Sequence, residues 1–431
     1  MEDTVKLIIE GKEYEFPVVV GSEGEKAIDI SKLRAETGYI SFDPGFANTG
    51  SCCSNISFVE GEAGKLNYRG IPIEELAQNS TFVETMHLLI WGELPTRQQL
   101  TRFSTLLNEH SMVHEDMQIF FQHFPMNSPP MNILSSMINA LRFFYTSVGS
   151  SSQPELEIVY IRLLSKIRTL AAMSYKISTG HRPVYPRPDL SYCANFLNMM
   201  FDNPVKPYII DDDIVKALNV FWIVRAEHEQ NNSTTAVRLV SSGKVNIYAA
   251  ISAGASALGG PLHGGAILSV MQMLERIYEQ GGDIKPFIER AKCHNFPTRL
   301  MGFGHRINKI YDLRAKIVKE EYLKLKKKLG LEDPLWEIVE NLTDEVKKDE
   351  YFIQHKLFPN VDLYSGLLLR AIGIPLSMFT VMYAIGRLPG WIAHWKEQHE
   401  DEKARLHRPR QIYVGPSLTD YTPMEDRKEI Y

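Results

Sequence analysis

The chain has 431 residues, of which 44% are hydrophobic and 23% are charged, and its formal net charge is −5. This is an ordinary globular composition, and the length suits one large domain together with a smaller one. Because no long basic block appears, the sequence argues against nucleic acid as a partner.

The first twenty residues predict a small β-hairpin. Apolar and polar residues alternate from Val5 to Ile9 and again from Tyr14 to Val20, and residues 10–12 supply the turn between them. Further short strands and turns are expected as far as Arg69.

From Ile71 onward the apolar residues follow helical spacing, and this pattern dominates to about Pro409. Thr81 and Glu84 are spaced as a capping box, which predicts that a helix begins immediately after Thr81. The tail after Val414 is polar and is expected to be extended.

Residues 246–258 predict a helix that is rich in alanine, glycine and serine. Small side chains let another backbone come close, so this helix fits a tight helix–helix contact or a subunit interface. A plain core helix is the alternative interpretation.

Several kinds of site and location are not indicated. The acidic start of the chain has no apolar core, so we expect neither a signal peptide nor a transit peptide. We therefore expect the protein to be cytoplasmic. The longest apolar stretch, Ala371–Gly386, is too short for a membrane span and predicts a buried helix without membrane contact. The cysteines fit no zinc motif and are expected to be free thiols: Cys52, Cys53, Cys193 and Cys293.

Three segments carry side chains that can do acid–base chemistry. His263 lies in Gly259–Gly265, His305 lies in Gly302–Arg306, and Asp362 is a lone acid between Pro359 and Gly366. Glycines around an imidazole would let a ligand approach the backbone. Taken singly, each segment is better explained as structural, because a lone histidine or a turn aspartate is common. The second segment also lacks the last glycine of a dinucleotide fingerprint.

In combination and in this order, the motifs resemble those of citrate synthases. The matching segments are HEQN at 228–231, PLHGGA at 261–266, GFGHR at 302–306, LRA at 313–315, NVDLYSG at 360–366, GR at 386–387, GWIAHW at 390–395 and RPR at 408–410. The segments GSC at 50–52 and FLNMMF at 196–201 are similar to the bacterial-type branch. The resemblance extends over roughly residues 5–415.

The resemblance implies a mostly α-helical, two-domain fold with a small N-terminal β-region. Residues 1–69 would form the β-rich region and residues 70–264 the first part of the large domain. Residues 265–377 would form the small domain, and residues 378–431 the return of the large domain with the tail.

The resemblance also implies roles for individual residues. Asp362 would be the base that removes a proton from acyl-CoA, His263 would hydrogen-bond the thioester oxygen, and His305 would polarise the ketone of oxaloacetate. The residues expected to bind oxaloacetate are His228, Arg314, Arg387 and, from a neighbouring subunit, Arg408. Arginine suits this substrate because its fork binds carboxylates bidentately. The partners are oxaloacetate and acyl-CoA, with no metal and no cofactor, in a homo-oligomer of the dimer or hexamer-of-dimers type.

Some residues near these motifs depart from the family pattern. Relatives commonly carry larger or more polar residues at Gly259, Ile267, Leu268, Asn308 and Leu363. The departures predict a roomier, more apolar acyl pocket, a longer acyl-CoA and a 2-alkylcitrate product. One alternative is an ordinary citrate synthase that uses acetyl-CoA, in which these departures are neutral drift. Another is a 2-methylcitrate synthase that uses propionyl-CoA. A non-catalytic structural or regulatory paralogue is an alternative of another class. Arg225 also departs, standing where bacterial relatives carry a histidine.

Overall fold

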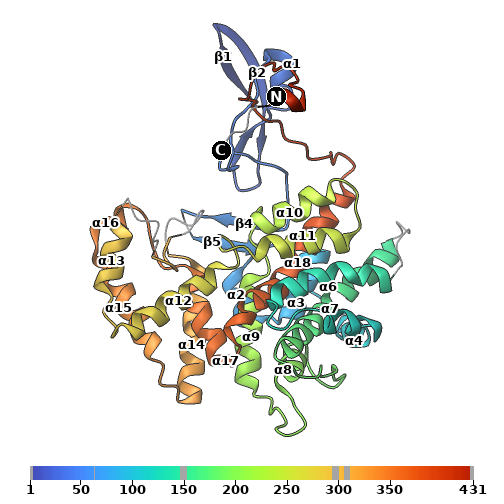
Figure 1. Ribbon diagram of the computed structural model, residues 1–431, viewed down its shortest axis with the longest axis vertical. Coiled ribbons are helices and arrows are strands. Elements are labelled where there is room, and N and C mark those ends of the chain that lie inside the picture. The colour runs from blue at the N-terminus through green and yellow to red at the C-terminus, as the bar shows by residue number, and fades with distance from the viewer. Residues whose placement is uncertain (1–2, 63, 146–152, 294–299, 305–310, 428–431) are drawn as a thin grey trace.

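The computed structural model describes residues 3–62, 64–145, 153–293, 300–304 and 311–427. It is mostly helical, as predicted, with two small sheets near the N-terminus (Figure 1). The strands are β1 (Thr4–Ile9), β2 (Lys12–Val20), β3 (Lys26–Ile28), β4 (Ser57–Glu60), β5 (Lys65–Tyr68) and β6 (Ile71–Pro72).

The helices of the first part of the chain are α1 (Leu33–Thr37), α2 (Ile73–Asn79), α3 (Phe82–Trp91), α4 (Arg97–Glu109), α5 (Asp116–Gln122), α6 (Pro130–Phe144), α7 (Gln153–Ser178), α8 (Tyr192–Phe201), α9 (Asp212–Arg225), α10 (Asn232–Ser241) and α11 (Ile247–Leu258). Those that follow are α12 (Ala266–Glu279), α13 (Lys285–Lys292), α14 (Leu313–Leu329), α15 (Pro334–Lys348), α16 (Glu350–Gln354), α17 (Val361–Ile372) and α18 (Phe379–Glu400), with short 3₁₀ turns η1 (Leu376–Met378) and η2 (Met424–Asp426).

The predicted hairpin is confirmed. β1 and β2 pair antiparallel with Ile9 opposite Lys12, and the turn residues Glu10 and Gly11 have φ of 52° and 80°. This conformation is easy for glycine, which explains its place in the turn. Strands β1, β2 and β3 form one sheet that lies with α1 apart from the main body of helices (Figure 1), while β4, β5 and β6 form a second sheet.

The predicted capping box is also confirmed. The Glu84 backbone N–H donates to Thr81 Oγ1 at 3.2 Å, and the Thr81 backbone N–H donates to Glu84 Oε2 at 2.7 Å. Helix α3 begins at Phe82 and ends before Gly92, whose φ is 93°. These bonds satisfy two backbone donors that a helix start leaves without partners.

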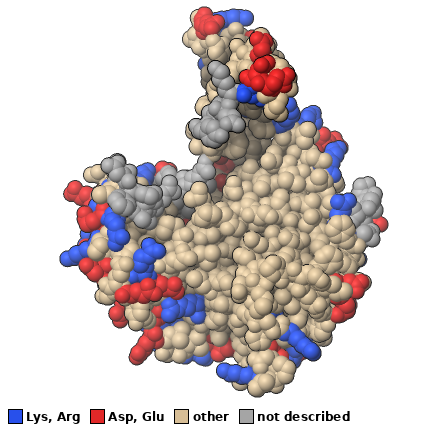
Figure 2. Space-filling model, viewed as in Figure 1, with Lys and Arg blue, Asp and Glu red and all other residues tan. Residues whose placement is uncertain are grey.

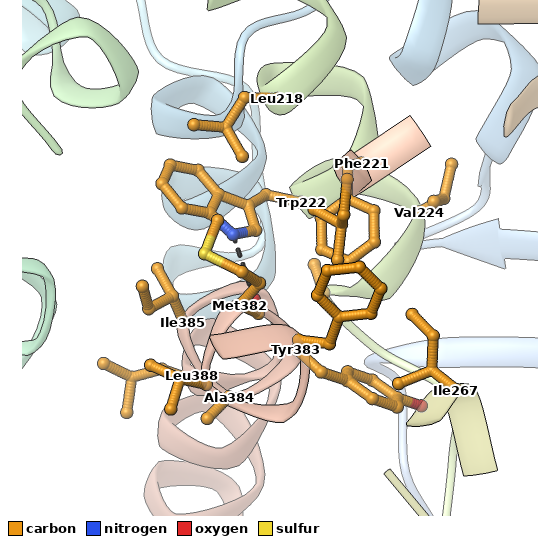
Figure 3. Close-up of a cluster of buried hydrophobic side chains, with 14 of the residues drawn as sticks. Leu218, Phe221, Trp222, Val224, Ile267, Met382, Tyr383, Ala384, Ile385 and Leu388 are labelled. Carbon is orange, nitrogen blue, oxygen red and sulfur yellow. Dashed lines mark hydrogen bonds between the residues drawn. The ribbon is translucent and has the colours of Figure 1, made fainter. Parts of the chain in front are cut away.

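The centre of the core lies between α9 and α18. Trp222 of α9 is fully buried, and its indole N–H donates to the backbone oxygen of Met382 at 3.0 Å (Figure 3). A Cβ on Gly386 would lie 3.1 Å from Cβ of Arg225, and a Cβ on Gly390 would overlap Glu227 Oε2 and the backbone oxygen of Ala226. Glycines therefore bring α18 against the end of α9 and the loop after it.

The small-residue helix at 246–258 is confirmed as α11, with Asn246 as its N-cap. It packs against α10 and α6 within the same subunit. The contact is close, because a Cβ on Gly254 would lie 2.5 Å from Cγ2 of Val237. The helix–helix interpretation therefore describes at least one face of α11.

Two predictions of helix extent were wrong. The apolar stretch Ala371–Gly386 is not one helix, because α17 ends at Ile372 and α18 begins at Phe379. Gly373, with φ of 92°, and Pro375 separate the two helices. The last helix ends at Glu400 rather than near Pro409, and the exposed, extended tail begins there. Among the described residues, no helix is long and apolar enough to cross a membrane.

The residues from α12 to α17 pack mainly on one another. Helix α17 packs against α14 and α12, and α15 packs against α12. This segment lies beside α9, which also contacts α14 and α17. The predicted boundaries of the small domain at 265 and 377 stay predictions. The predicted thiols are free at all four cysteines.

Candidate active site

His263 lies in a tight turn between α11 and α12. The backbone N–H groups of His263 and Gly265 both donate to the oxygen of Gly260, at 3.1 and 3.0 Å. A Cβ on Gly264 would lie 2.7 Å from the backbone oxygen of Leu258, and one on Gly265 would lie 2.8 Å from that of Gly260. The two glycines after His263 are thus required by the close approach of backbone.

The imidazole of His263 is held in one orientation. Its Nε2 lies 3.3 Å from the backbone N–H of Ser233 and 2.9 Å from the Ser233 hydroxyl, and its ring lies 6.1 Å from that of Tyr383. Burial lowers the pKa of His263 to about 4, with Arg387 adding to the effect. The ring is therefore neutral near pH 7. Because a backbone N–H can only donate, Nε2 is the acceptor and Nδ1 carries the proton.

Asp362 lies in the first turn of α17. Asn360 is the N-cap, and its side chain accepts from the Asp362 backbone N–H at 3.0 Å. The Asp362 carboxylate accepts a hydrogen bond from Nη2 of Arg225 at 2.7 Å, and the same nitrogen donates to Ser365 Oγ at 2.7 Å. The side chain of Arg225 is 1% exposed and that of Asp362 is 18% exposed. The candidate base is therefore paired with the arginine that departs from the family pattern.

Arg387 and Tyr383 lie one turn apart on α18. Arg387 Nε donates to the backbone oxygen of Arg225 at 2.7 Å, and Nη2 donates to the Tyr383 hydroxyl at 3.1 Å. The guanidiniums of Arg225 and Arg387 lie 4.5 and 5.1 Å from the centre of the Tyr383 ring. Burial alone would raise the pKa of Tyr383, but the two arginines lower it below its usual value. Nη1 of Arg387 is buried without a hydrogen-bond partner among the described residues.

The other expected oxaloacetate residues lie in different settings. His228 is buried in the loop between α9 and α10, next to the contact with α18. Arg314 is buried at the start of α14, where Nε and Nη2 donate to the two oxygens of Asp312 at 3.1 and 2.8 Å. Burial would lower the pKa of Arg314, but Asp312 raises it above its usual range. Arg408 lies exposed in the tail after α18.

His305 and Asn308 lie outside the described residues, but the segment that leads to them is described. The Gly304 backbone N–H donates to the oxygen of Phe358 at 2.7 Å, and the Asn360 side chain donates to the oxygen of Gly304 at 2.9 Å. Residues 302–304 are therefore joined to the residues just before Asp362.

The remaining acyl-pocket candidates do not share one environment. Gly259 is exposed at the end of α11, where a Cβ would lie 3.6 Å from Met131. Ile267 is buried on the side of Tyr383 (Figure 3), and Leu268 is half-buried. Leu363 is fully buried against Gly302, where a Cβ would lie 2.9 Å from Cδ1 of Leu363.

Sequence comparison matches residues 45–410 to the family described as "Citrate synthase, C-terminal domain". Two proteins named "Citrate synthase 1", from Mycobacterium tuberculosis strains CDC 1551 / Oshkosh and ATCC 25618 / H37Rv, are each 46% identical to the chain. Each match covers 427 residues, which is 99% of this chain and 99% of the relative. The chain belongs to the citrate synthase family. It is a citrate synthase-type enzyme, which condenses an acyl-CoA with oxaloacetate.

Solved citrate synthases share the fold. The enzyme from Thermotoga maritima MSB8 has a TM-score of 0.78 and 32% identity, and the match covers 90% of this chain and 100% of that one. The enzyme from Pyrobaculum aerophilum has a TM-score of 0.79 and 33% identity, covering 99% and 100%. The Thermoplasma acidophilum enzyme, in a ternary complex with carboxymethyl coenzyme A and oxaloacetate, has a TM-score of 0.82 and 28% identity, covering 90% and 100%.

Citrate synthases carry out their reaction with neither a metal nor a cofactor. In the part of the chain that the structure describes, no group of three or more His, Cys, Asp or Glu residues could hold a metal ion.

Three residues of the site were missed by sequence reasoning or were given another meaning. Tyr383 and Ser233 were not considered, and Arg225 was noted as a departure without its pairing to Asp362. Tyr383 could have been found from its spacing to Arg387, because residues four apart on a helix lie on the same face.

Proposed function

We propose that Asp362, His263 and His305 catalyse the condensation and that His228, Arg314 and Arg387 bind oxaloacetate. The observation that carries this proposal is the set of contacts around Tyr383. His263 and Arg387 contact its ring or hydroxyl directly, and Asp362 is joined to it through Arg225. Residues from the turn after α11 and from α9, α17 and α18, far apart in sequence, thus meet around Tyr383.

The chemistry divides between these groups. An α C–H bond of the acyl group breaks, Asp362 takes the proton, and the electron pair moves into an enolate. The enolate oxygen accepts a hydrogen bond from Nδ1–H of His263, which the neutral ring can supply. The enolate carbon then bonds to the ketone carbon of oxaloacetate, and His305 protonates the new alkoxide. Hydrolysis of the thioester releases CoA.

The two carboxylates of oxaloacetate need cationic partners. The buried Nη1 of Arg387, which has no partner within the described residues, supports a role in binding one of them. Arg314 is already paired with Asp312, so it is fixed in position before substrate arrives.

The acyl group has two candidates. We propose acetyl-CoA as the principal donor, because the 46% identical relatives of full length are named citrate synthases. A longer acyl chain is the second candidate, supported by the apolar residues Ile267 and Leu363, which lie close in sequence to His263 and Asp362. Both side chains are packed in the core, so a longer acyl chain would find space there only if these side chains moved.

We also propose that the enzyme is at least a dimer and that Arg408 completes the partner's site. Figure 2 shows a broad face over α6, α10 and α11 that carries few charged side chains. The tail after Glu400 exposes large apolar residues: Leu406, Ile412, Tyr413, Val414, Leu418 and Tyr421. Such surface is costly in water and would be covered by a second copy. Light scattering of the purified enzyme tests the dimer, and a monomer with full activity would refute it.

The function is tested by CoA release in the presence of oxaloacetate with acetyl-, propionyl-, hexanoyl- and octanoyl-CoA. Acetyl-CoA should give the highest kcat/KM, and a maximum at six to eight carbons would establish the second candidate instead. Asp362→Asn should lower kcat by roughly 10² to 10⁴ without loss of fold. Asp211→Asn, which changes an N-cap aspartate of α9, is the matched control and should keep its turnover. No turnover with any thioester in the folded wild type would favour the non-catalytic paralogue.

A further inference from the structure

We propose that Arg225 is shared between Asp362 and a carboxylate of oxaloacetate, so that oxaloacetate binding releases the base for proton abstraction. This inference rests on the proposed function of the site. In the described structure Arg225 holds Asp362, and oxaloacetate would compete for the same guanidinium.

The first observation is the strength of the hold on Asp362. Arg225 Nη2 donates to Asp362 Oδ1 at 2.7 Å, and its side chain is 1% exposed. Charge-assisted hydrogen bonds of this length in a buried setting are among the stronger ones. This bond engages Oδ1 and holds the whole carboxylate in one orientation, so Oδ2 can take up a proton only from the direction that the pairing with Arg225 allows.

The second observation is the unmatched donors on the two arginines. Nε of Arg225 and Nη1 of Arg387 are both buried, and neither has a partner among the described residues. Both guanidiniums stand over the ring of Tyr383, and the Arg387 Nε donates to the backbone oxygen of Arg225. Buried N–H groups without acceptors are costly, and a carboxylate matches two such groups from neighbouring arginines.

The third observation is the balance of charge. Arg225 and Arg387 bring two positive charges to this space, and Asp362 brings one negative charge. The other titratable groups here are His263, which is neutral near pH 7, and Tyr383, whose hydroxyl accepts from Arg387. Two more charged groups act on this space: Arg314, which is paired with Asp312, and the carboxylate of Glu227, which interacts with Arg387 and His394. Asp362 offsets one of the two arginine charges, and the carboxylate of Glu227 is shared among Arg387, His394 and Ser57. A substrate carboxylate would therefore supply the acceptor that the partnerless N–H groups of the two arginines still need.

These observations give Arg225 the part of a positioning residue that links the two substrates. Without oxaloacetate, Arg225 keeps Asp362 paired, which protects a bound acyl-CoA from being deprotonated too early. With oxaloacetate bound, the Arg225 guanidinium donates to a carboxylate of the substrate as well, and its bond to Asp362 weakens. Asp362 then becomes available to take the proton from acyl-CoA. Because coupling between sites is reciprocal, loss of the Asp362 charge must strengthen oxaloacetate binding through Arg225.

The test is a double-mutant cycle read by calorimetric binding of oxaloacetate alone, with no acyl-CoA and no turnover. Arg225→Gln should weaken binding about 10- to 100-fold, since one charge-assisted contact is lost. Asp362→Asn should strengthen binding about 5- to 10-fold, because Arg225 is then free for the substrate. In the double variant, the gain from Asp362→Asn should fall below about twofold.

The cycle separates the proposal from a general electrostatic effect. If removing the Asp362 charge strengthened binding equally with and without Arg225, the sharing of Arg225 would be refuted. Unchanged oxaloacetate affinity in Arg225→Gln would refute it as well.

Two further variants complete the design. Arg168→Gln, a fully buried arginine of α7 bonded to Tyr192 and Asn108, is the matched control and should bind oxaloacetate within twofold of the wild type. If thermal melting shows that Arg225→Gln does not fold, Arg225→Met takes its place in the cycle, since it removes the charge and keeps an unbranched side chain in the buried position. Wild type that fails to bind oxaloacetate at all would refute the proposed function itself.

Discussion

The neutral state of His263 has a consequence for stability that can be measured. Its pKa is about 4 in the folded protein, because of burial and then of Arg387, against 6.5 for an exposed histidine. The replacement His263→Gln removes this titration while keeping an acceptor that can face the Ser233 N–H. We therefore expect the wild type and the variant to respond differently to acid.

The sign follows from the direction of the pKa shift. Between pH 6.5 and 4 the unfolded chain binds a proton on this residue and the folded chain does not, so the free energy of unfolding falls as the pH falls. The difference of about 2.5 pH units corresponds to about 3 kcal/mol at most. The contribution is constant above pH 6.5 and is fully lost below about pH 4.

The assay is urea denaturation at fixed protein concentration and at several pH values from 7.5 to 4. The free energy of unfolding of the wild type minus that of His263→Gln should decrease by up to about 3 kcal/mol across this range. Taking the difference cancels the carboxylates that titrate in the same window. A difference that stays constant with pH would show that His263 is not held neutral by its surroundings.

Two other residues of the same region give sharp expectations. Burial raises the pKa of Glu229 to about 7, so its folded form prefers a proton and stability is lost as the pH rises from 4.5 through 7. Glu229→Gln, which can still accept the Val59 N–H, should therefore be more stable than the wild type at pH 8, by up to about 3 kcal/mol, and equal to it at pH 4 by urea denaturation. Gly390→Ala would place a methyl group against the backbone oxygen of Ala226, and it should lower the free energy of unfolding by about 1–3 kcal/mol. A melting temperature equal to that of the wild type would contradict this last expectation.

Local features of the fold could be predicted because they depend on neighbouring residues. The hairpin at the N-terminus and the capping box at Thr81 are set by alternation and by a spacing of three. The family was predicted from motifs whose order is itself information. The apolar run at 371–386 was misread because its composition is uniform while Gly373 and Pro375 divide it.

The pairings within the site could not be predicted in the same way. Arg225 and Asp362 lie 137 positions apart, and only the approach of α9 and α17 brings them together. A salt bridge of this kind leaves no trace in local spacing. The roles of His263, His305 and Asp362 stay predictions until their variants are assayed.

Helix α18 carries both the glycines that allow close packing and two residues of the candidate site. Gly386 and Gly390 admit no larger side chain without displacing α9 or the loop after it, and Tyr383 and Arg387 stand on the same helix. A mutation selected for a tighter or looser core at this helix would also reposition the arginine meant for substrate. Adaptation of such an enzyme to a new temperature and its adaptation to a new substrate would therefore draw on the same few codons.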